Sequence, residues 1–97
     1  MSLPVIIRPE AKRDIREART WYQEISPEFG NAFVRGLDQA IALAQQYPLA
    51  FPLVRRTFRR VLLRRFPYAV FYHVGGQQIV IVAVLHQARD PEMLATR

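Results

Sequence analysis

The 97-residue sequence contains no cysteine and only two histidines, His73 and His86. Without thiols, neither a disulfide framework nor a thiolate metal site can form, and this composition fits a reducing cytoplasm. The two histidines fall on different expected strands, and neither strand carries an acid, so a site with three or four metal ligands is not expected. We therefore predict a cytoplasmic protein that uses no metal and no cofactor.

Acidic residues are also missing from a long stretch of the chain. No Asp or Glu occurs between Gln39 and Ala88, although the net charge of the whole chain is +6. The arginines near the middle of this interval are Arg55, Arg56, Arg59, Arg60, Arg64 and Arg65. Guanidinium groups bind phosphate or carboxylate through paired hydrogen bonds, and a surface of one sign attracts partners of the other. We predict that these arginines and Arg89 form one docking face for an acidic macromolecule; the alternative is that they only keep the domain soluble.

Long apolar runs and nucleotide-binding loops are absent as well. The longest purely apolar run, Ile79–Leu85, has seven residues, which is too short for a membrane helix and typical of a buried strand. The N-terminus shows no secretory signal pattern, and no glycine-rich loop precedes Lys and Ser or Thr. No serine or threonine has an adjacent base that would activate it as a nucleophile. These absences argue against most conventional enzyme classes and favour a binding protein.

Length and composition indicate one domain over residues 1–97, because a chain that is 51% hydrophobic and 23% charged resembles a globular protein. The β-branched run Val5–Ile7 predicts a short strand that leads directly into a helix beginning at Pro9. Charged residues occupy one side of that helix, as expected of a solvated surface. The other side is an apolar stripe with helical spacing, formed by Ala11, Ile15, Ala18, Tyr22 and Ile25.

A second helix is expected to begin immediately after the first. Ser26, Pro27 and Glu28 supply an N-cap, a proline in the first turn and an acid near the helix N-terminus. The helix should end near Tyr47, because Pro48 disfavours helical geometry in the residue before it. Its apolar stripe consists of Phe29, Phe33, Leu37, Ala40, Ile41 and Ala44. Two helices joined by so tight a break predict a helical hairpin.

Three strands are expected in the C-terminal half, at residues 59–66, 68–74 and 78–85, which are rich in Val, Ile, Tyr and Phe. Gly75 and Gly76 join the last two strands, because two glycines can adopt the positive φ angles of a hairpin turn. The element order β-α-α-β-β-β predicts an α+β fold, with the helical hairpin packed on one face of a mainly antiparallel sheet.

Four side chains of these strands could carry chemistry. Tyr68 and Tyr72 share one strand face and are expected to pack in the core. His73 faces the opposite side and is expected to be a surface or hydrogen-bonded strand residue. His86 ends the buried strand three residues before Arg89, and both a structural and a functional role remain open for it.

Four segments resemble the ParE/RelE superfamily of bacterial toxins, in the same order and over essentially the whole chain. The segments are Arg8–Ala11, Ser26–Glu28, Phe66–Tyr72 and Val84–Pro91. The closing His-x-x-Arg-Asp-Pro pattern is most similar to the ParE branch. The resemblance implies the toxin of a type II toxin-antitoxin, or plasmid-stabilisation, module. ParE-like members are inhibitors of DNA gyrase, whereas RelE-like members cut messenger RNA in the ribosomal A site.

The two branches differ in the groups that they require. Cleavage of RNA at the 2′-hydroxyl needs a base, an acid and cations around the phosphate. If the chain is a ribonuclease, His86, Arg65 and Arg89 are the expected catalytic residues. No base is evident, because the C-terminal strands carry no Asp or Glu, the only lysine is Lys12 on the first helix, and tyrosine has a pKa of about 10. We therefore favour non-enzymatic inhibition of DNA gyrase, with ribosome-dependent cleavage of messenger RNA as the alternative.

The positive charge also predicts an acidic antitoxin. A disordered acidic segment that folds on binding would neutralise the arginines and bury apolar surface as it becomes ordered. We expect this segment to lie along the helical hairpin or beside an exposed strand edge. No membrane partner is expected.

Overall fold

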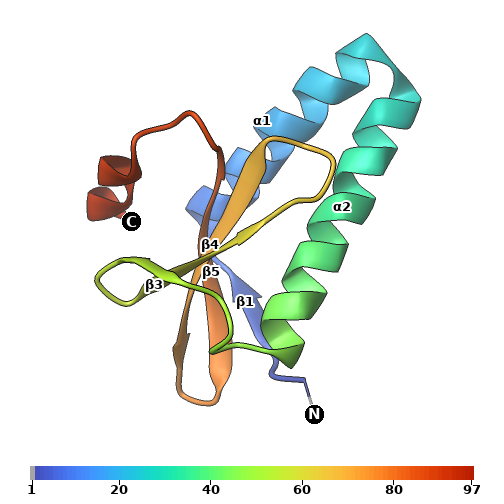
Figure 1. Ribbon diagram of the computed structural model, residues 1–97. Coiled ribbons are helices and arrows are strands. Elements are labelled where there is room, and N and C mark those ends of the chain that lie inside the picture. Colours follow the sequence, from blue (N-terminus) through green and yellow to red (C-terminus); the bar gives the residue numbers. More distant parts are fainter. Residues whose placement is uncertain (1) are drawn as a thin grey trace.

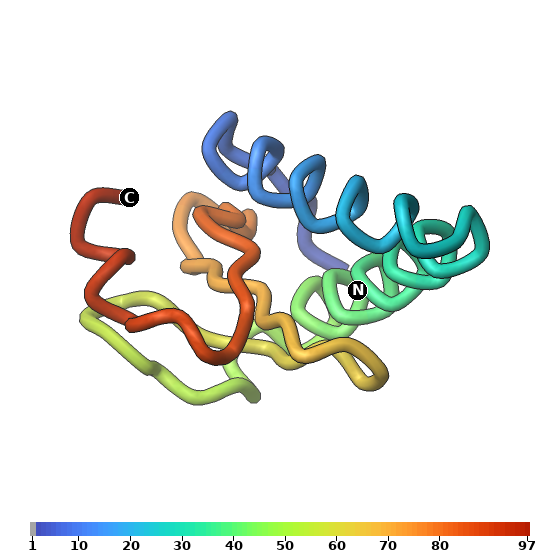
Figure 2. Tube along the Cα trace, turned by 90° about the horizontal axis from the view of Figure 1, so that it is seen from above, coloured from blue at the N-terminus to red at the C-terminus, as the bar shows by residue number. Residues whose placement is uncertain are grey.

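A five-stranded sheet forms the centre of the molecule, and two antiparallel helices pack on one of its faces (Figure 1). The computed structural model describes residues 2–97. The helices and the C-terminal segment lie on different sides of the strands, so the molecule has three layers (Figure 2).

The bounds of the elements follow the predicted order closely. They are β1 (Val5–Ile7), α1 (Pro9–Ile25), α2 (Pro27–Gln46), β2 (Leu53–Arg55), β3 (Phe58–Leu62), β4 (Tyr68–Gly75), β5 (Gln78–His86) and the 3₁₀ helix η1 (Pro91–Thr96). The strand order in the sheet is β1-β5-β4-β3-β2; β1 pairs with β5 in parallel and the other three pairs are antiparallel. The predicted α+β fold is confirmed. Within residues 2–97, neither helix combines the length and the apolar character needed to cross a membrane.

The helical hairpin turns within a single residue. Ser26 ends α1 and caps α2, and its hydroxyl oxygen accepts a hydrogen bond from the backbone N–H of Glu28 at 3.2 Å, as predicted. Gly30 allows the two helices to approach closely, because a Cβ atom there would lie 3.0 Å from Cβ of Gln23. The tight turn leaves the apolar side chains of Ile25 and Phe29 exposed at the hairpin tip.

Both faces of β5 are buried, which explains its long apolar run. The residues that pack toward the helices are Ile79, Ile81 and Val84. Those that pack toward η1 are Val80, Val82, Ala83 and Leu85. A β-bulge leaves Val82 without a partner between two consecutive β4–β5 pairs, and it shifts the alternation of side chains by one residue. The second core, closed by Leu94 of η1, was not predicted.

Two boundaries in the C-terminal half differ from the prediction. The strand expected over residues 59–66 ends at Leu62, and a turn follows in which the N–H of Leu63 donates to the carbonyl of Tyr68 at 3.0 Å. Pro67 has no N–H to continue the strand pairing. The hairpin turn between β4 and β5 falls on Gly76 and Gln77, with φ angles of +61° and +60°, one residue later than expected.

Two elements were missed because each is too short to show a pattern. β2 pairs with β3 after a tight turn in which Arg56 has a φ angle of +50°. η1 begins at Pro91 and is capped by Asp90, whose carboxylate accepts a hydrogen bond from the N–H of Glu92 at 2.9 Å. The three-residue length of β2 gives no room for a recognisable alternation.

An ion pair closes the outer edge of β5 beyond its pairing with β1. The guanidinium of Arg97 binds both carboxylate oxygens of Asp14, at 2.7 and 3.1 Å, and the two side chains are only 14% and 10% exposed. Asp14 also accepts a hydrogen bond from the N–H of Val84, and Arg97 donates to the carbonyl of Val82, both at 3.0 Å. The bond to Asp14 raises the pKa of Arg97 above its usual value. The pair therefore takes the place of a neighbouring strand at a sheet edge.

The substitution Asp14→Asn tests this pair. The amide keeps the side-chain shape but leaves the guanidinium of Arg97 without a counter-charge, so we expect a loss of about 3 kcal/mol in the free energy of unfolding. Denaturant unfolding measures the loss. Glu24→Gln, on the exposed surface of α1, is the matched control and should change stability by less than about 0.5 kcal/mol. Equal stabilities of the two variants would show that the pair contributes little.

Candidate functional site

Four aromatic side chains join the helical hairpin to the sheet. We call Tyr22, Phe33, Phe66 and Tyr68 the aromatic cluster. The ring centroids of Tyr22 and Phe66 lie 4.8 Å apart edge to face, and Phe33 meets Phe66 and Tyr68 edge to face at 5.5 and 5.3 Å. Tyr22 comes from α1 and Phe33 from α2, whereas Phe66 comes from the turn after β3 and Tyr68 from β4. Their packing separates two groups of surface hollows, one beside Phe66 and one beside Tyr68.

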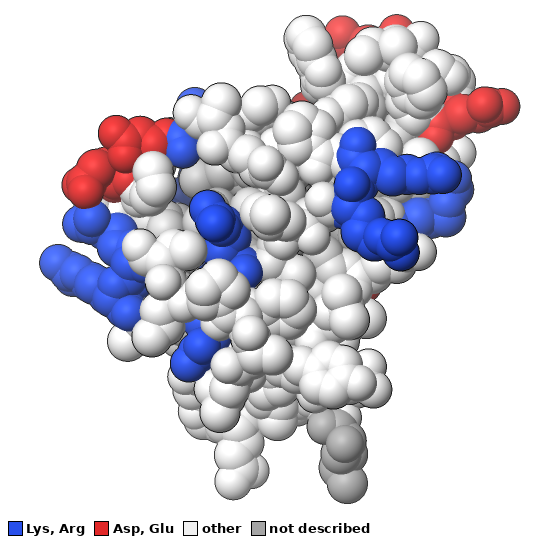
Figure 3. Space-filling view, viewed as in Figure 1, with Lys and Arg blue, Asp and Glu red and all other residues white. Residues whose placement is uncertain are grey.

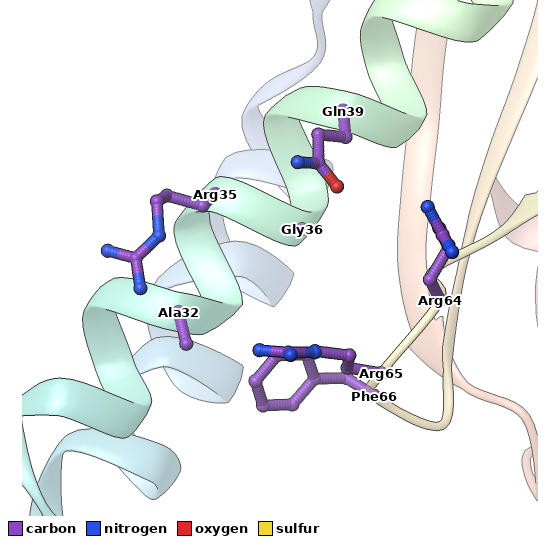
Figure 4. A pocket seen from close by; sticks show the side chains of 7 residues that line it. All are labelled: Ala32, Arg35, Gly36, Gln39, Arg64, Arg65 and Phe66. Atoms are coloured by element: carbon purple, nitrogen blue, oxygen red, sulfur yellow. The ribbon is translucent and has the colours of Figure 1, made fainter.

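The hollow beside Phe66 is lined by arginines. We call it the arginine groove; it has a volume of about 290 Å³ and is lined by Ala32, Arg35, Gly36, Gln39, Arg64, Arg65 and Phe66. Arg35 projects from α2, and Arg64 and Arg65 project from the turn that follows β3 (Figure 4). Gly36 has no side chain to fill the space between them. The turn after β3 therefore brings two arginines of the acid-free interval next to one from α2.

An apolar hollow continues the arginine groove toward the hairpin tip. It has a volume of about 370 Å³, and its lining residues are Tyr22, Ile25, Phe29, Ala32, Arg65, Phe66 and Pro67. We call it the tip hollow. Because Ala32, Arg65 and Phe66 line both hollows, apolar and cationic surfaces are continuous along α2.

The hollow on the other side of the aromatic cluster contains His86. We call it the histidine hollow; it has a volume of about 230 Å³ and is lined by Asp14, Glu17, Ala18, Trp21, Tyr68, Val84, Leu85, His86 and Arg89. Its acids come from α1 and its basic residues from the end of β5 and the turn that follows. Sequence reasoning missed Glu17, because no local pattern shows which end of the sheet α1 crosses.

His86 is held in one orientation. Its Nδ1 accepts a hydrogen bond from the backbone N–H of Ala88 at 3.0 Å, and its ring meets Tyr68 edge to face at 5.3 Å. An imidazole whose Nδ1 accepts this bond carries its proton on Nε2, which can donate a hydrogen bond. Burial raises the pKa of Tyr68; the charge of Arg89 opposes this and that of Glu17 adds to it. Both charges therefore act on the phenol at this hollow.

The predicted arginines do not form one continuous face. On the face that Figure 3 shows, basic side chains gather in separate patches with uncharged surface between them. Arg55 forms an ion pair with Glu92 at 2.8 Å, and Arg59 donates to the carbonyls of Leu49 and Phe51 at 3.3 and 2.7 Å. These two arginines therefore stabilise the fold.

The remaining predicted arginines lie on different elements and in different surroundings. Arg60 lies on β3 next to Arg59 and faces the other side of the sheet, because side chains alternate along a strand. Arg56 is exposed in the turn between β2 and β3. Arg65 lines the arginine groove, whereas Arg89 lines the histidine hollow with His86. The three residues expected for RNA cleavage are thus divided between two hollows.

The remaining strand predictions agree with the structure. Tyr72 is buried in the core, and its hydroxyl donates to the carbonyl of Pro48 at 2.7 Å. Tyr68 packs against the same core, and His73 is a half-buried strand residue whose ring centroid lies 6.0 Å from that of Phe58.

Within residues 2–97, no three His, Cys, Asp or Glu side chains are grouped so that they could hold a metal ion.

Comparison with known proteins gives a family match over most of the chain. A family model described as the ParE toxin of the type II toxin-antitoxin system parDE matches residues 5–91. A search of curated proteins gives no significant match.

Solved structures of toxin-antitoxin systems share this fold. The chromosomal ParDE system from P. aeruginosa matches with a TM-score of 0.77 and 20% identity, over 88% of this chain and 96% of that one. The RelBE2 complex from Mycobacterium tuberculosis matches with a TM-score of 0.58 and 22% identity, over 89% and 99%. The E. coli DinJ-YafQ complex matches with a TM-score of 0.61 and 9% identity, over 91% and 96%. At these identities the likeness concerns the fold alone.

The fold and the family match together define the class of protein: a toxin of a type II toxin-antitoxin system. The chain belongs to the ParE toxin family.

The buried tyrosines predict a loss of stability in alkali. Burial raises the pKa of Tyr72 above its usual value, so the unfolded chain releases this proton first and stability falls as the pH rises above about 10. Tyr72→Phe removes this loss but also the hydrogen bond to Pro48. We expect a deficit of about 1 kcal/mol at pH 7 that shrinks above pH 10, measured by denaturant unfolding. An equal deficit at both pH values would contradict the assignment.

Proposed function

We propose that this ParE-family toxin inhibits DNA gyrase by binding and not by catalysis. The main support is that the three residues expected for RNA cleavage do not converge, because Arg65 lines the arginine groove while His86 and Arg89 line the histidine hollow. Cleavage of a phosphodiester requires a base, an acid and cations to converge on one phosphate. Gyrase is the target that the resemblance to the ParE branch implies.

A cognate antitoxin is the second part of the proposal. The solved relatives are toxin-antitoxin systems, and this chain carries a net charge of +6 that suits an acidic partner. We propose that such an antitoxin neutralises the toxin in the cytoplasm. Both proteins would be encoded by one module of the plasmid-stabilisation type. Expression of the toxin without this partner should therefore inhibit growth.

Ribosome-dependent cleavage of messenger RNA is the second candidate, and the position of Glu17 favours it. A carboxylate in the histidine hollow supplies the base that the C-terminal strands lack, with Arg89 available for a phosphate and the Nε2–H of His86 for a hydrogen bond to the departing oxygen. Among residues 2–97, however, no hydrogen bond connects Glu17 to His86 or Arg89. The gyrase proposal is therefore preferred.

A supercoiling assay tests the gyrase proposal. Purified toxin, gyrase, relaxed DNA and ATP should give a loss of supercoiling or an accumulation of cleaved DNA. A basic protein of similar size and pI, at the same salt concentration, controls for non-specific binding to the DNA. Unchanged supercoiling at saturating toxin would reject gyrase as the target.

A cleavage assay with ribosomes and messenger RNA tests the alternative. If the histidine hollow is a nuclease site, the wild type should cut the RNA, and Glu17→Gln or His86→Ala should each slow cleavage by about 100-fold or more. Sequencing of the RNA ends measures the cuts. No cleavage by the wild type, together with inhibition of gyrase in the first assay, would favour the binding mechanism.

A further inference from the structure

A pocket between the β2–β3 turn and η1 lies apart from the hollows around the helical hairpin. It has a volume of about 230 Å³ and is on the face of the sheet that η1 covers. The residues that line it are Arg55, Arg56, Thr57, Phe58, Leu94, Ala95 and Arg97. Guanidinium groups come from three of these residues, and none of the lining residues is acidic. We call it the β2–β3 pocket.

The guanidinium of Arg55 is only partly satisfied inside the protein. Its Nη1 binds the carboxylate of Glu92 at 2.8 Å, but its Nε is buried and has no hydrogen-bond partner. Within residues 2–97, this Nε is the only buried side-chain nitrogen or oxygen without a partner. A buried donor without an acceptor destabilises the fold, so it calls for an explanation. An oxyanion that binds the Nε edge of Arg55 would supply the missing acceptor.

Arg56 adds a cation that no neighbouring acid neutralises. It occupies the exposed turn with a φ angle of +50°, a conformation that glycine adopts freely and that strains other residues. A long charged side chain in such a position indicates a use for its charge. Both ion pairs among residues 2–97 involve other arginines. Figure 3 shows basic side chains on the side of the molecule where Figure 1 shows the turn before β3.

The other two arginines of the pocket already bind acids, but one of these acids is easily displaced. The side chain of Glu92 is 70% exposed, and an exposed ion pair of this kind contributes little to stability. A phosphate can therefore replace this carboxylate on Arg55. Asp14 is buried together with Arg97, so that pair stays in place and Arg97 serves as a wall of the pocket.

The donors around the pocket favour phosphate over carboxylate. Two guanidinium groups and the hydroxyl of Thr57 come from the end of β2 and from the turn. A carboxylate is planar and is matched by one guanidinium, whereas the oxygens of a phosphate point in several directions and accept from several donors. The pocket is also smaller than the roughly 300–1,000 Å³ of sites that enclose whole small molecules. It therefore suits one phosphate group and not an entire nucleotide.

The surroundings of the pocket favour a phosphate that belongs to a nucleic-acid strand. Arg60 lies on the same face of β3 as Phe58, two residues or about 7 Å further along. Cations thus continue along the strand beyond the pocket, and the absence of acids between Gln39 and Ala88 leaves little to repel a polyanion. A two-stranded β-ribbon, such as β2 with β3, also fits the major groove of duplex DNA.

We propose that the β2–β3 pocket binds a phosphate of duplex DNA and that Arg56 and Arg60 bind phosphates beside it. When DNA binds, Arg55 exchanges the carboxylate of Glu92 for the phosphate. Gyrase acts on DNA, so this contact would hold the toxin on the substrate of its proposed target. The inference rests on the proposed function for that biological role, whereas the pocket itself is testable with DNA alone.

Fluorescence anisotropy of a short labelled duplex tests the pocket in the purified toxin. Arg56→Gln should weaken binding about fivefold and lower the slope of log K against log salt by about one, because one phosphate contact is lost. Arg13→Gln removes the same charge from the exposed surface of α1 and should keep the slope of the wild type. Equal effects of the two substitutions would show non-specific attraction and overturn the inference.

Glu92→Gln should change DNA binding in the opposite direction. Removal of the carboxylate that competes for Arg55 should tighten binding about threefold. Asp38→Asn removes an equal charge from the exposed surface of α2 and should bind like the wild type. Unchanged or weaker binding by Glu92→Gln would contradict the exchange. Denaturant unfolding of each variant checks that the fold is intact.

Competitors identify the class of ligand. Unlabelled duplex should displace the labelled duplex at a lower concentration than single-stranded RNA or a glutamate-rich peptide of equal charge. Stronger competition by the RNA or by the peptide would overturn the assignment to duplex DNA.

The supercoiling assay separates this inference from the proposed function. Arg56→Gln should inhibit gyrase less than Arg13→Gln does. If the wild type inhibits gyrase and both variants bind DNA and inhibit gyrase equally, the pocket is wrong and the proposed function stands. If the DNA measurements agree with the proposal but saturating toxin leaves supercoiling unchanged, the proposed function fails and the pocket stands.

Discussion

Edge-to-face packing in the aromatic cluster is the contact on which the functional surfaces depend. Tyr22 and Phe33 come from the two helices, Phe66 from the turn after β3 and Tyr68 from β4. Each such pair contributes about 0.5–1.5 kcal/mol beyond the burial of its area. These contacts bring rings from both helices, the turn and β4 together. The cluster therefore sets where the hairpin lies over the sheet.

The position of the hairpin in turn determines which residues line the three hollows. Phe66 forms a wall of the arginine groove and of the tip hollow, and Tyr68 forms a wall of the histidine hollow. Burial raises the pKa of Tyr22 and of Tyr68, so both phenols remain neutral at physiological pH and serve as packing surfaces. A neutral, tightly packed wall keeps the cations of one hollow apart from the acids and His86 of the other.

Local features of the sequence were sufficient to predict the helical hairpin, and long-range features were not. The cap at Ser26 and the apolar stripe of α2 involve residues that are close together in the sequence, so both can be recognised from the sequence alone. The presence of Glu17 and His86 in one hollow depends instead on how α1 crosses β5, because the two residues are nearly seventy positions apart along the chain. The bulge at Val82 hid the second core in the same way, because a continuous apolar run does not show which residue faces which side.

The different surroundings of the arginines show why net charge alone does not define a docking face. Arg55 and Arg59 are neighbours in sequence of Arg56 and Arg60, yet the first two are held by Glu92 and by backbone carbonyls. Each of these two guanidinium groups is thus held in place by an internal hydrogen bond from one of its nitrogens. Arg64 and Arg65 differ because Pro67 ends the strand and places them in a turn, where no carbonyl or acid within residues 2–97 binds them. Within residues 2–97, Arg65 therefore lies without an internal partner beside the exposed apolar side chains at the hairpin tip.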